Sequence, residues 1–141
     1  MKTITAHRIA ALDNLTARLN GGYLRYYDGT KPTRVSSALI AGNHVLAELR
    51  YNATAFAGAS ADGNDIVTAV ANAIVSGTGT AAAGAGTVAT FASGFASDGT
   101  TRVADFTLSL TSGDIVVNTL TIIQGAAVAI TSHIATNPDG T

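Results

Sequence analysis

The pattern closest to a ligand-binding motif lies in a Gly- and Ala-rich segment near the middle of the chain. Residues 77–82 read Gly-Thr-Gly-Thr-Ala-Ala, which satisfies the loose dinucleotide pattern G-x-G-x-x-[GA], and Asp98 follows at about the expected spacing. That pattern holds a pyrophosphate only where a helix begins directly after the glycines. Here residues 83–86 read Ala-Gly-Ala-Gly and lead into a predicted strand. We therefore expect no bound nucleotide and no other cofactor.

Catalytic motifs are equally incomplete. Residues 58–61 read Gly-Ala-Ser-Ala and begin like the nucleophile elbow G-x-S-x-G, but Asp62 stands where the second glycine is needed. A phosphate-binding loop ends in lysine after a glycine-rich run, and Lys31, the last lysine of the chain, has no such run before it. The sequence therefore predicts a protein that is not an enzyme.

Residue types that can ligate metal ions are present, but their spacing does not form a metal-binding motif. His7, His44 and His133 do not share the short spacings of paired metal ligands, so we expect each imidazole to be a solvated surface group. The run Asp-Gly-Asn-Asp at residues 62–65 does not fit a calcium loop and is predicted to be a polar turn. Because the chain has no cysteine, disulfides and thiolate zinc sites are excluded.

Positive charge and large amphipathic side chains coincide in the N-terminal third. Residues 1–50 carry a net charge of +4 and residues 51–141 a net charge of −5, and every tyrosine lies within the first 51 residues. Tyrosine and arginine dominate interface hot spots, and the overall net charge of −1 argues against nucleic acid as the partner. The predicted partner interface consists of Tyr23, Arg25, Tyr26, Tyr27, Lys31, Arg34, Arg50 and Tyr51, together with Leu12, Leu15 and Leu19.

The three leucines belong to the first predicted element, a helix over residues 4–19. Thr5 is its expected N-cap, and Asn-Gly-Gly at residues 20–22 is a typical helix stop. An isolated amphipathic helix of this length is marginally stable in water, so its apolar face must dock on the chain's own sheet or on a partner. That face is formed at three- and four-residue spacing by Ile9, Leu12, Leu15 and Leu19.

The remaining chain has the short alternating runs and turn residues of β-structure. Aromatic and alternating residues predict strands at 23–27 and 45–51, joined by a long connection that carries Pro32. Residues 53–86 are rich in small side chains and predict thin strands and extended loops, with one strand at 65–75.

The C-terminal part predicts four further strands. Asp98-Gly99 marks a hairpin between strands at 87–96 and 102–110. Two more strands follow at 115–123 and 126–134, the last with Val128, Ile130 and Ile134 on one face and His133 on the other.

Composition agrees with a β-protein of small residues. Alanine, threonine and glycine fill 62 of 141 positions, and charged residues are only 12% of the chain. This excludes charged disordered tails and, because glycine lacks a three-residue period, collagen. The predicted fold is mainly β, an antiparallel, jelly-roll-like β-sandwich with one N-terminal α-helix. It forms a single domain over 1–141, with a helical arm at 1–21 and the sandwich at 22–141.

Apolar runs in the chain are short. The longest, at residues 66–75 and 120–130, fall well below the roughly 20 apolar residues of a membrane-spanning helix, so no membrane contact is expected. Arg8 and Asp13 interrupt the apolar region that a secretory signal needs after Met1-Lys2. With so few large side chains for its core, the domain is expected to gain stability from a homo-oligomer, with a trimer as one option.

Several segments resemble small proteins encoded among the head genes of tailed bacteriophages. The most specific is Leu-Arg-Tyr-Tyr-Asp-Gly-Thr-Lys-Pro at residues 24–32. The others, in the same order as in those proteins and covering nearly the whole chain, are residues 11–15, 46–51, 72–74, 97–100 and 125–128.

This resemblance implies a virion structural protein without catalytic residues, assembled in the host cytoplasm. We expect it to be a capsid decoration, or cement, protein that binds the major capsid protein or another virion protein on the outside of the head. A neck, tail or fibre component, and a carbohydrate-binding β-sandwich of a receptor-binding protein, are the alternatives.

Overall fold

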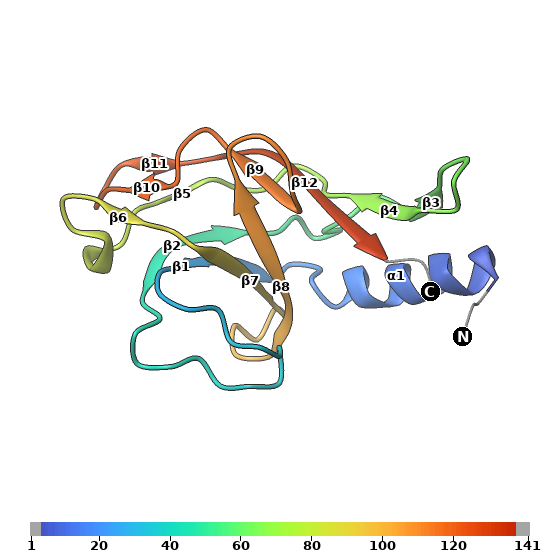
Figure 1. Cartoon of the computed structure of the whole chain (residues 1–141), viewed down its shortest axis with the longest axis horizontal. Helices are drawn as coiled ribbons and strands as arrows, with labels where there is room; N and C mark the ends of the chain where they lie inside the picture. Colours follow the sequence, from blue (N-terminus) through green and yellow to red (C-terminus); the bar gives the residue numbers. More distant parts are fainter. Residues whose placement is uncertain (1–3, 138–141) are drawn as a thin grey trace.

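The computed structural model describes residues 4–137, in which short strands predominate (Figure 1). This confirms the prediction of a mainly β fold with one N-terminal helix. Lys2 and Asp139, which contribute to the charges above, lie outside the described residues. The elements are α1 (Thr5–Ala17), β1 (Tyr23–Tyr27), β2 (Val45–Arg50), β3 (Ser60–Ala61), β4 (Val67–Val70), β5 (Gly77–Thr78), the 3-10 helix η1 (Ala81–Ala83), β6 (Thr87–Val88), β7 (Phe91–Phe95), β8 (Arg102–Ser109), β9 (Ile115–Val117), β10 (Thr121–Ile122), β11 (Ala127–Val128) and β12 (Ile130–Asn137).

Eight strands form one mixed sheet in the order β2-β1-β7-β8-β9-β12-β4-β3, and β10-β6 and β11-β5 are two separate two-stranded sheets. The expectation of purely antiparallel strands is wrong at one place, because β8 and β9 run parallel. The short connection between them folds back, and the Asp114 carboxylate accepts a hydrogen bond from the Thr107 backbone N–H at 3.0 Å. A side chain thus satisfies a donor that a regular hairpin would pair with backbone.

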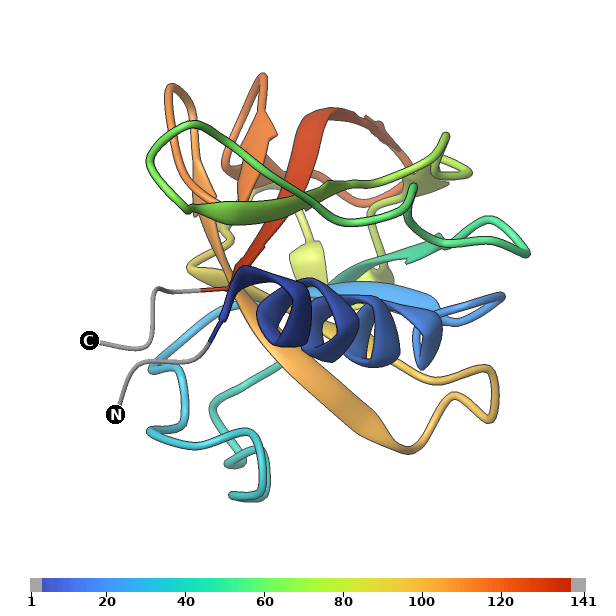
Figure 2. The same cartoon turned by 90° about the vertical axis from the view of Figure 1, so that its right-hand side faces the viewer.

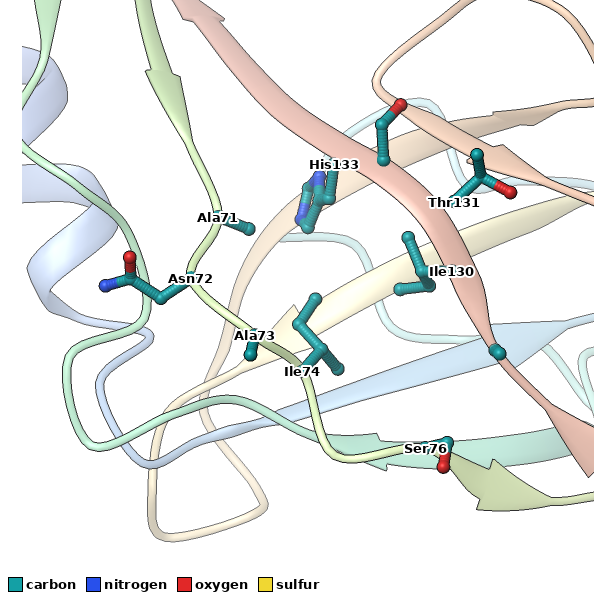
Figure 3. Close-up of a pocket in the computed structure, with 10 residues that line it drawn as sticks. Ala71, Asn72, Ala73, Ile74, Ser76, Ile130, Thr131 and His133 are labelled. Carbon is teal, nitrogen blue, oxygen red and sulfur yellow. The ribbon is translucent and has the colours of Figure 1, made fainter.

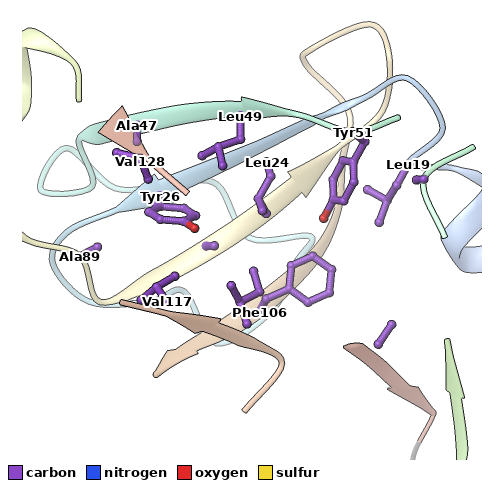
Figure 4. Close-up of a cluster of buried hydrophobic side chains, with 14 of the residues drawn as sticks. Leu19, Leu24, Tyr26, Ala47, Leu49, Tyr51, Ala89, Phe106, Val117 and Val128 are labelled. Atoms are coloured by element: carbon purple, nitrogen blue, oxygen red, sulfur yellow. The ribbon is translucent and has the colours of Figure 1, made fainter. Parts of the chain in front are cut away.

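The sheet bends so that its two halves lie on opposite sides of the core, giving a sandwich-like arrangement (Figure 2). One core cluster combines residues of both halves with Leu12 of α1 and with Leu19, which follows the helix. Leu24, Tyr26 and Phe106 lie near its centre (Figure 4). Alanine occupies seven of the 21 buried positions of this cluster, so its Leu, Ile, Val, Phe and Tyr side chains supply most of the buried apolar area.

Helix α1 buries a different stripe from the one predicted. Leu12 and Leu19 are buried in the chain's own core, but Leu15 is 40% exposed, and Arg8 and Thr16 complete the buried stripe instead. A spacing of four residues from Arg8 keeps these side chains on one side of the helix, whereas Leu15 lies off that line. The predicted burial of Leu15 is therefore not seen in the single chain.

The ends of α1 also differ in how well they were predicted. Thr5 is not the N-cap: Ile4 holds that position, and the Thr5 hydroxyl donates to the Asp65 carboxylate. The predicted stop is confirmed, since the helix ends before Gly21, which adopts a φ of +63° that favours glycine.

The long connection between β1 and β2 folds back over part of the sheet's outer face. Arg102 holds it there, donating to the Ser37 carbonyl at 2.7 Å while forming a buried salt bridge with Asp105 at 2.6 Å. Beneath the connection, Tyr27 stacks on Phe91 with ring centroids 5.3 Å apart, and Leu39 packs against this pair. Beyond this cover, Tyr23 and Arg25 are partly exposed, and Glu48 and Arg50 are exposed.

The predicted hairpin is confirmed: β7 and β8 pair around Asp98-Gly99, and Gly99 has a φ of +72°. Four predicted strands differ in extent. The strand at 65–75 is reduced to β4, with Val67 and Ala69 buried. The strands at 87–96, 115–123 and 126–134 are each divided, into β6 and β7, β9 and β10, and β11 and β12. The predicted polar turn at 62–65 is also confirmed, because the Asp62 carboxylate accepts backbone N–H groups within it.

Candidate functional site

The open part of the outer face carries a cluster that we call the tyrosine–arginine surface: Tyr23, Arg25, Glu48 and Arg50. Strands β1 and β2 position it, because antiparallel pairing sets Tyr23 opposite Arg50 and Arg25 opposite Glu48. Residues directly opposite on one face of an antiparallel pair are within side-chain contact. Strand register therefore brings together residues that are more than twenty positions apart in sequence.

Arg25 is held by groups of its own chain. Its Nε donates to the Glu48 carboxylate at 2.7 Å, and its Nη1 donates to the Gly99 carbonyl at 2.8 Å. The guanidinium carbon also lies 4.5 Å from the centroid of the Phe95 ring and 5.4 Å from that of Tyr23. Arg25 is thus a fixed part of the surface that neutralises Glu48.

Arg50 is exposed and less fully engaged. Its guanidinium carbon lies 4.4 Å from the centroid of the Tyr23 ring, a distance typical of a cation–π contact. Its Nε and Nη2 reach the Gly21 carbonyl at 3.4 and 3.3 Å, which are long hydrogen bonds. Next to it, a shallow recess of about 300 Å³ is lined in part by Leu49, Val75 and Ser76.

The remaining residues of the predicted interface are dispersed. Lys31 and Arg34 are exposed in the connection between β1 and β2, and Leu15 is part of a recess beside Arg18 and Val103. A correction applies to five others, whose side chains are buried within the chain and not accessible to a partner in this fold: Leu12, Leu19, Tyr26, Tyr27 and Tyr51.

His133 is the clearest error of the sequence-based prediction. It was expected in solvent, but it is only 3% exposed and packs edge-on against Phe56 and Phe106 with centroid separations of 5.0 and 4.5 Å. The Tyr51 hydroxyl lies 2.8 Å from its Nε2, and the Asp114 carbonyl lies 3.1 Å from its Nδ1. Because a carbonyl can only accept, Nδ1 carries the proton and Nε2 accepts from Tyr51.

Burial governs the ionisation of this pair. It lowers the pKa of His133 to about 4, against the weaker opposing influence of Asp114. It raises the pKa of the Tyr51 hydroxyl well above its usual range. Both groups are therefore neutral near pH 7, and both His133 ring nitrogens are occupied, so the pair is suited to hold the core together and not to transfer protons.

A register shift explains why the alternation in β12 was misleading. Val128 and Ile130 pack against the core as predicted, but the pairing with β9 shifts between Ile130 and Ser132, and after it His133 and Ala135 face inward. An extra residue in one strand reverses the face of every later side chain. The sequence does not indicate this shift, because residues 133–135, His-Ile-Ala, fit a strand with either His133 and Ala135 or Ile134 facing the core.

A cavity of about 370 Å³ lies where two chain segments separate (Figure 3). Residues 67–70 pair with 134–137 and residues 77–78 pair with 127–128, but between these ladders the segments diverge. Ile74 and Ile130 extend into the gap, and Ser76, Thr131 and Ser132 add hydroxyls to its lining. The lining can form hydrogen bonds, yet its one titratable residue, His133, directs both ring nitrogens to protein groups.

Two further properties concern residues 4–137. No group of three or more His, Cys, Asp or Glu side chains that could hold a metal ion occurs in this part of the chain. Within the same residues, none of the helices has the length and hydropathy needed to cross a bilayer. Among the described residues, three members of the predicted interface meet on the tyrosine–arginine surface: Tyr23, Arg25 and Arg50.

Comparison with known proteins yielded no match to a protein-family model, to a curated protein or to a solved structure.

Proposed function

We propose that this chain is a non-enzymatic structural protein of a tailed-bacteriophage virion that attaches to another virion protein through the tyrosine–arginine surface. In its most specific form, the proposal is a capsid decoration protein bound to the major capsid protein on the outside of the head. The arrangement of Tyr23, Arg25 and Arg50 carries the proposal: three large amphipathic side chains share an open face of β1 and β2.

The contrast with the surroundings supports an attachment role. Many exposed side chains elsewhere belong to alanine, threonine and serine, which contribute little binding energy per residue. Tyr23 and Arg50 instead combine large contact area with polar tips, and their mutual contact holds them in place. The resemblance of residues 24–32 to phage head-gene proteins falls on the strand that carries two of these side chains.

A carbohydrate-binding module is the competing class. Sugars stack on the open face of an aromatic ring, and Tyr23 is the only tyrosine that is not buried. Its ring is covered by the Arg50 guanidinium at 4.4 Å and flanked by Gly99. This arrangement favours a protein contact over sugar stacking.

Attachment can be measured on purified particles of the phage that encodes the chain, prepared without it and then mixed with the purified protein. We expect saturable binding that weakens with salt, because the surface carries two arginines. The double variant Tyr23→Ala/Arg50→Glu should lose most of the occupancy. Arg34→Glu is the matched control, since it reverses one charge in the exposed connection and should bind nearly as well.

Three outcomes separate the alternatives. Density on the outer shell in a cryo-EM map of the loaded particles supports decoration, whereas density at the neck, tail or fibres supports the other virion positions. Equal losses for Arg34→Glu and the double variant would assign attachment to the general charge of the N-terminal third. No saturable binding of the wild-type protein would refute the proposed function.

A further inference from the structure

We propose that Arg50 is a carboxylate clamp: its free edge receives an aspartate or glutamate side chain of the virion protein to which this chain attaches. The inference rests on the proposed function and names the chemistry of the partner. It depends on which N–H groups of Arg25 and Arg50 have no hydrogen-bond acceptor in the described part of the chain.

The guanidinium of Arg50 has two edges with parallel N–H groups. The edge formed by Nε and Nη2 is directed at the Gly21 carbonyl, at 3.4 and 3.3 Å. The other edge, formed by Nη1 and the second hydrogen of Nη2, has no acceptor among residues 4–137. A planar pair of donors of this kind matches the two oxygens of a carboxylate.

Tyr23 keeps that edge in a fixed place. The guanidinium lies over its ring at 4.4 Å, and the two residues are direct neighbours across the β1–β2 pair. An arginine that is already confined loses less side-chain entropy on binding than one that is free in solvent. This contact uses none of the N–H donors of the open edge for a hydrogen bond.

Arg25 cannot take this role, but it makes the role possible for Arg50. Its Nε and Nη1 are committed to Glu48 and Gly99. By pairing with Glu48 at 2.7 Å, it neutralises the one acidic side chain of this surface. An incoming carboxylate therefore meets a neutral pair and one available cation instead of a nearby negative charge.

The recess beside Arg50 strengthens the contact. Val75, which is 63% exposed, forms an apolar part of its lining, next to Ser76. A partner segment that covers Val75 excludes water from one side of the charge pair, and charge-assisted hydrogen bonds gain strength as water is removed. The partner that fits is an acidic side chain flanked by apolar residues.

The test compares Arg50→Lys with Arg50→Gln in the particle-binding measurement, with Arg34→Gln as the matched control. Lysine keeps the charge but lacks the planar fork, so we expect Arg50→Lys to bind at least about tenfold more weakly than wild type, near Arg50→Gln. Arg34→Gln should remain within about twofold. All three variants should melt like wild type, because both arginine side chains are exposed.

A second arm examines the partner directly. Particle carboxylates are converted to amides with carbodiimide and glycinamide, and wild-type binding should then fall to the level of Arg50→Gln. If Arg50→Lys binds like wild type, or if amidation leaves wild-type binding unchanged, the carboxylate clamp is wrong even though attachment stands. If wild type does not bind untreated particles, the proposed function itself fails.

Discussion

The two faces of β1 carry similar residue types with different consequences. Tyr23 and Arg25 point outward and stay partly open, whereas Leu24 and Tyr26 point inward and are completely buried. Tyr27 shares the outward face, yet the connection between β1 and β2 covers it. Strand alternation therefore assigns a side, and only the tertiary cover decides whether that side meets solvent.

The core and the outer face of the sheet each hold a tyrosine next to a basic side chain, with different roles. Inside, the Tyr51 hydroxyl bonds to neutral His133 in an aromatic surrounding, so the contact adds to a packed core. Outside, Tyr23 lies against charged Arg50, so the contact orients a cation that can still bind something else. The comparison predicts that changes to the inner pair alter folding and changes to the outer pair alter attachment.

The largest effect is expected for Tyr51→Ala. The side chain is 2% exposed, and its removal leaves a cavity beside Phe56 and deprives His133 of its hydrogen-bond donor. Removing a buried aromatic ring costs about 3–5 kcal/mol of unfolding free energy. Urea unfolding followed by circular dichroism measures it; a loss below about 1 kcal/mol would contradict the burial of Tyr51.

Acid should weaken the fold through His133. Its pKa is about 4 in the folded chain and near 6.5 when unfolded, so between these values the unfolded state binds more protons. Stability is therefore expected to fall as the pH drops from about 6.5 to about 4, by roughly 3 kcal/mol in total.

Unfolding midpoints at pH values across this window measure the effect. His133→Gln is the control: its fold is weaker at neutral pH, but its stability should change much less over the same window. A wild-type midpoint that stays constant from about pH 6.5 to about pH 4.5 would show that His133 titrates normally and is not enclosed.

Two tyrosine-to-phenylalanine substitutions measure how much each buried hydroxyl contributes to stability. Tyr51→Phe leaves the His133 Nε2 without a partner and should cost about 1–2 kcal/mol. Tyr26→Phe removes a buried hydroxyl that has no hydrogen-bond partner among the described residues, so it should be neutral or stabilise by up to about 1 kcal/mol. Equal losses in the two variants would mean that the Tyr26 hydroxyl is also hydrogen-bonded, for example to water.

Local signals were sufficient for much of the fold. The helix stop at Gly21, the Asp98-Gly99 turn and the strands that contain Tyr23 and Val45 depend on short-range preferences, and the structure has them. The parallel β8–β9 pair and the shift in β12 depend on which strands become neighbours. Alternation of residue types along one strand does not reveal where that strand has one residue more than its partner.

The residue types of the candidate site could be predicted from the sequence, but not which of these residues meet on one surface. Charge and aromatic content identified the N-terminal third, and strand alternation already separated Tyr26 from Tyr23. Nothing in the sequence indicated that the β1–β2 connection would cover Tyr27. It is held there by a hydrogen bond from Arg102 to the Ser37 carbonyl, which joins residues far apart in the chain. The cross-strand pairing of Arg25 with Glu48, which leaves Arg50 as the available cation, likewise follows from register.

Among the variants expected to lose stability, Tyr23→Ala, the surface counterpart of Tyr51→Ala, should lose the least. Tyr23 is half-buried, and its contacts with Arg25 and Arg50 are cation–π contacts at the surface, so the loss should be about 1 kcal/mol or less. Particle binding should nevertheless fall, because Arg50 loses the ring that confines it. Thermal melting and occupancy measured on the same preparation test both statements. A loss near that of Tyr51→Ala, with unchanged attachment, would make Tyr23 a structural residue and remove the distinction between the core pair and the surface pair.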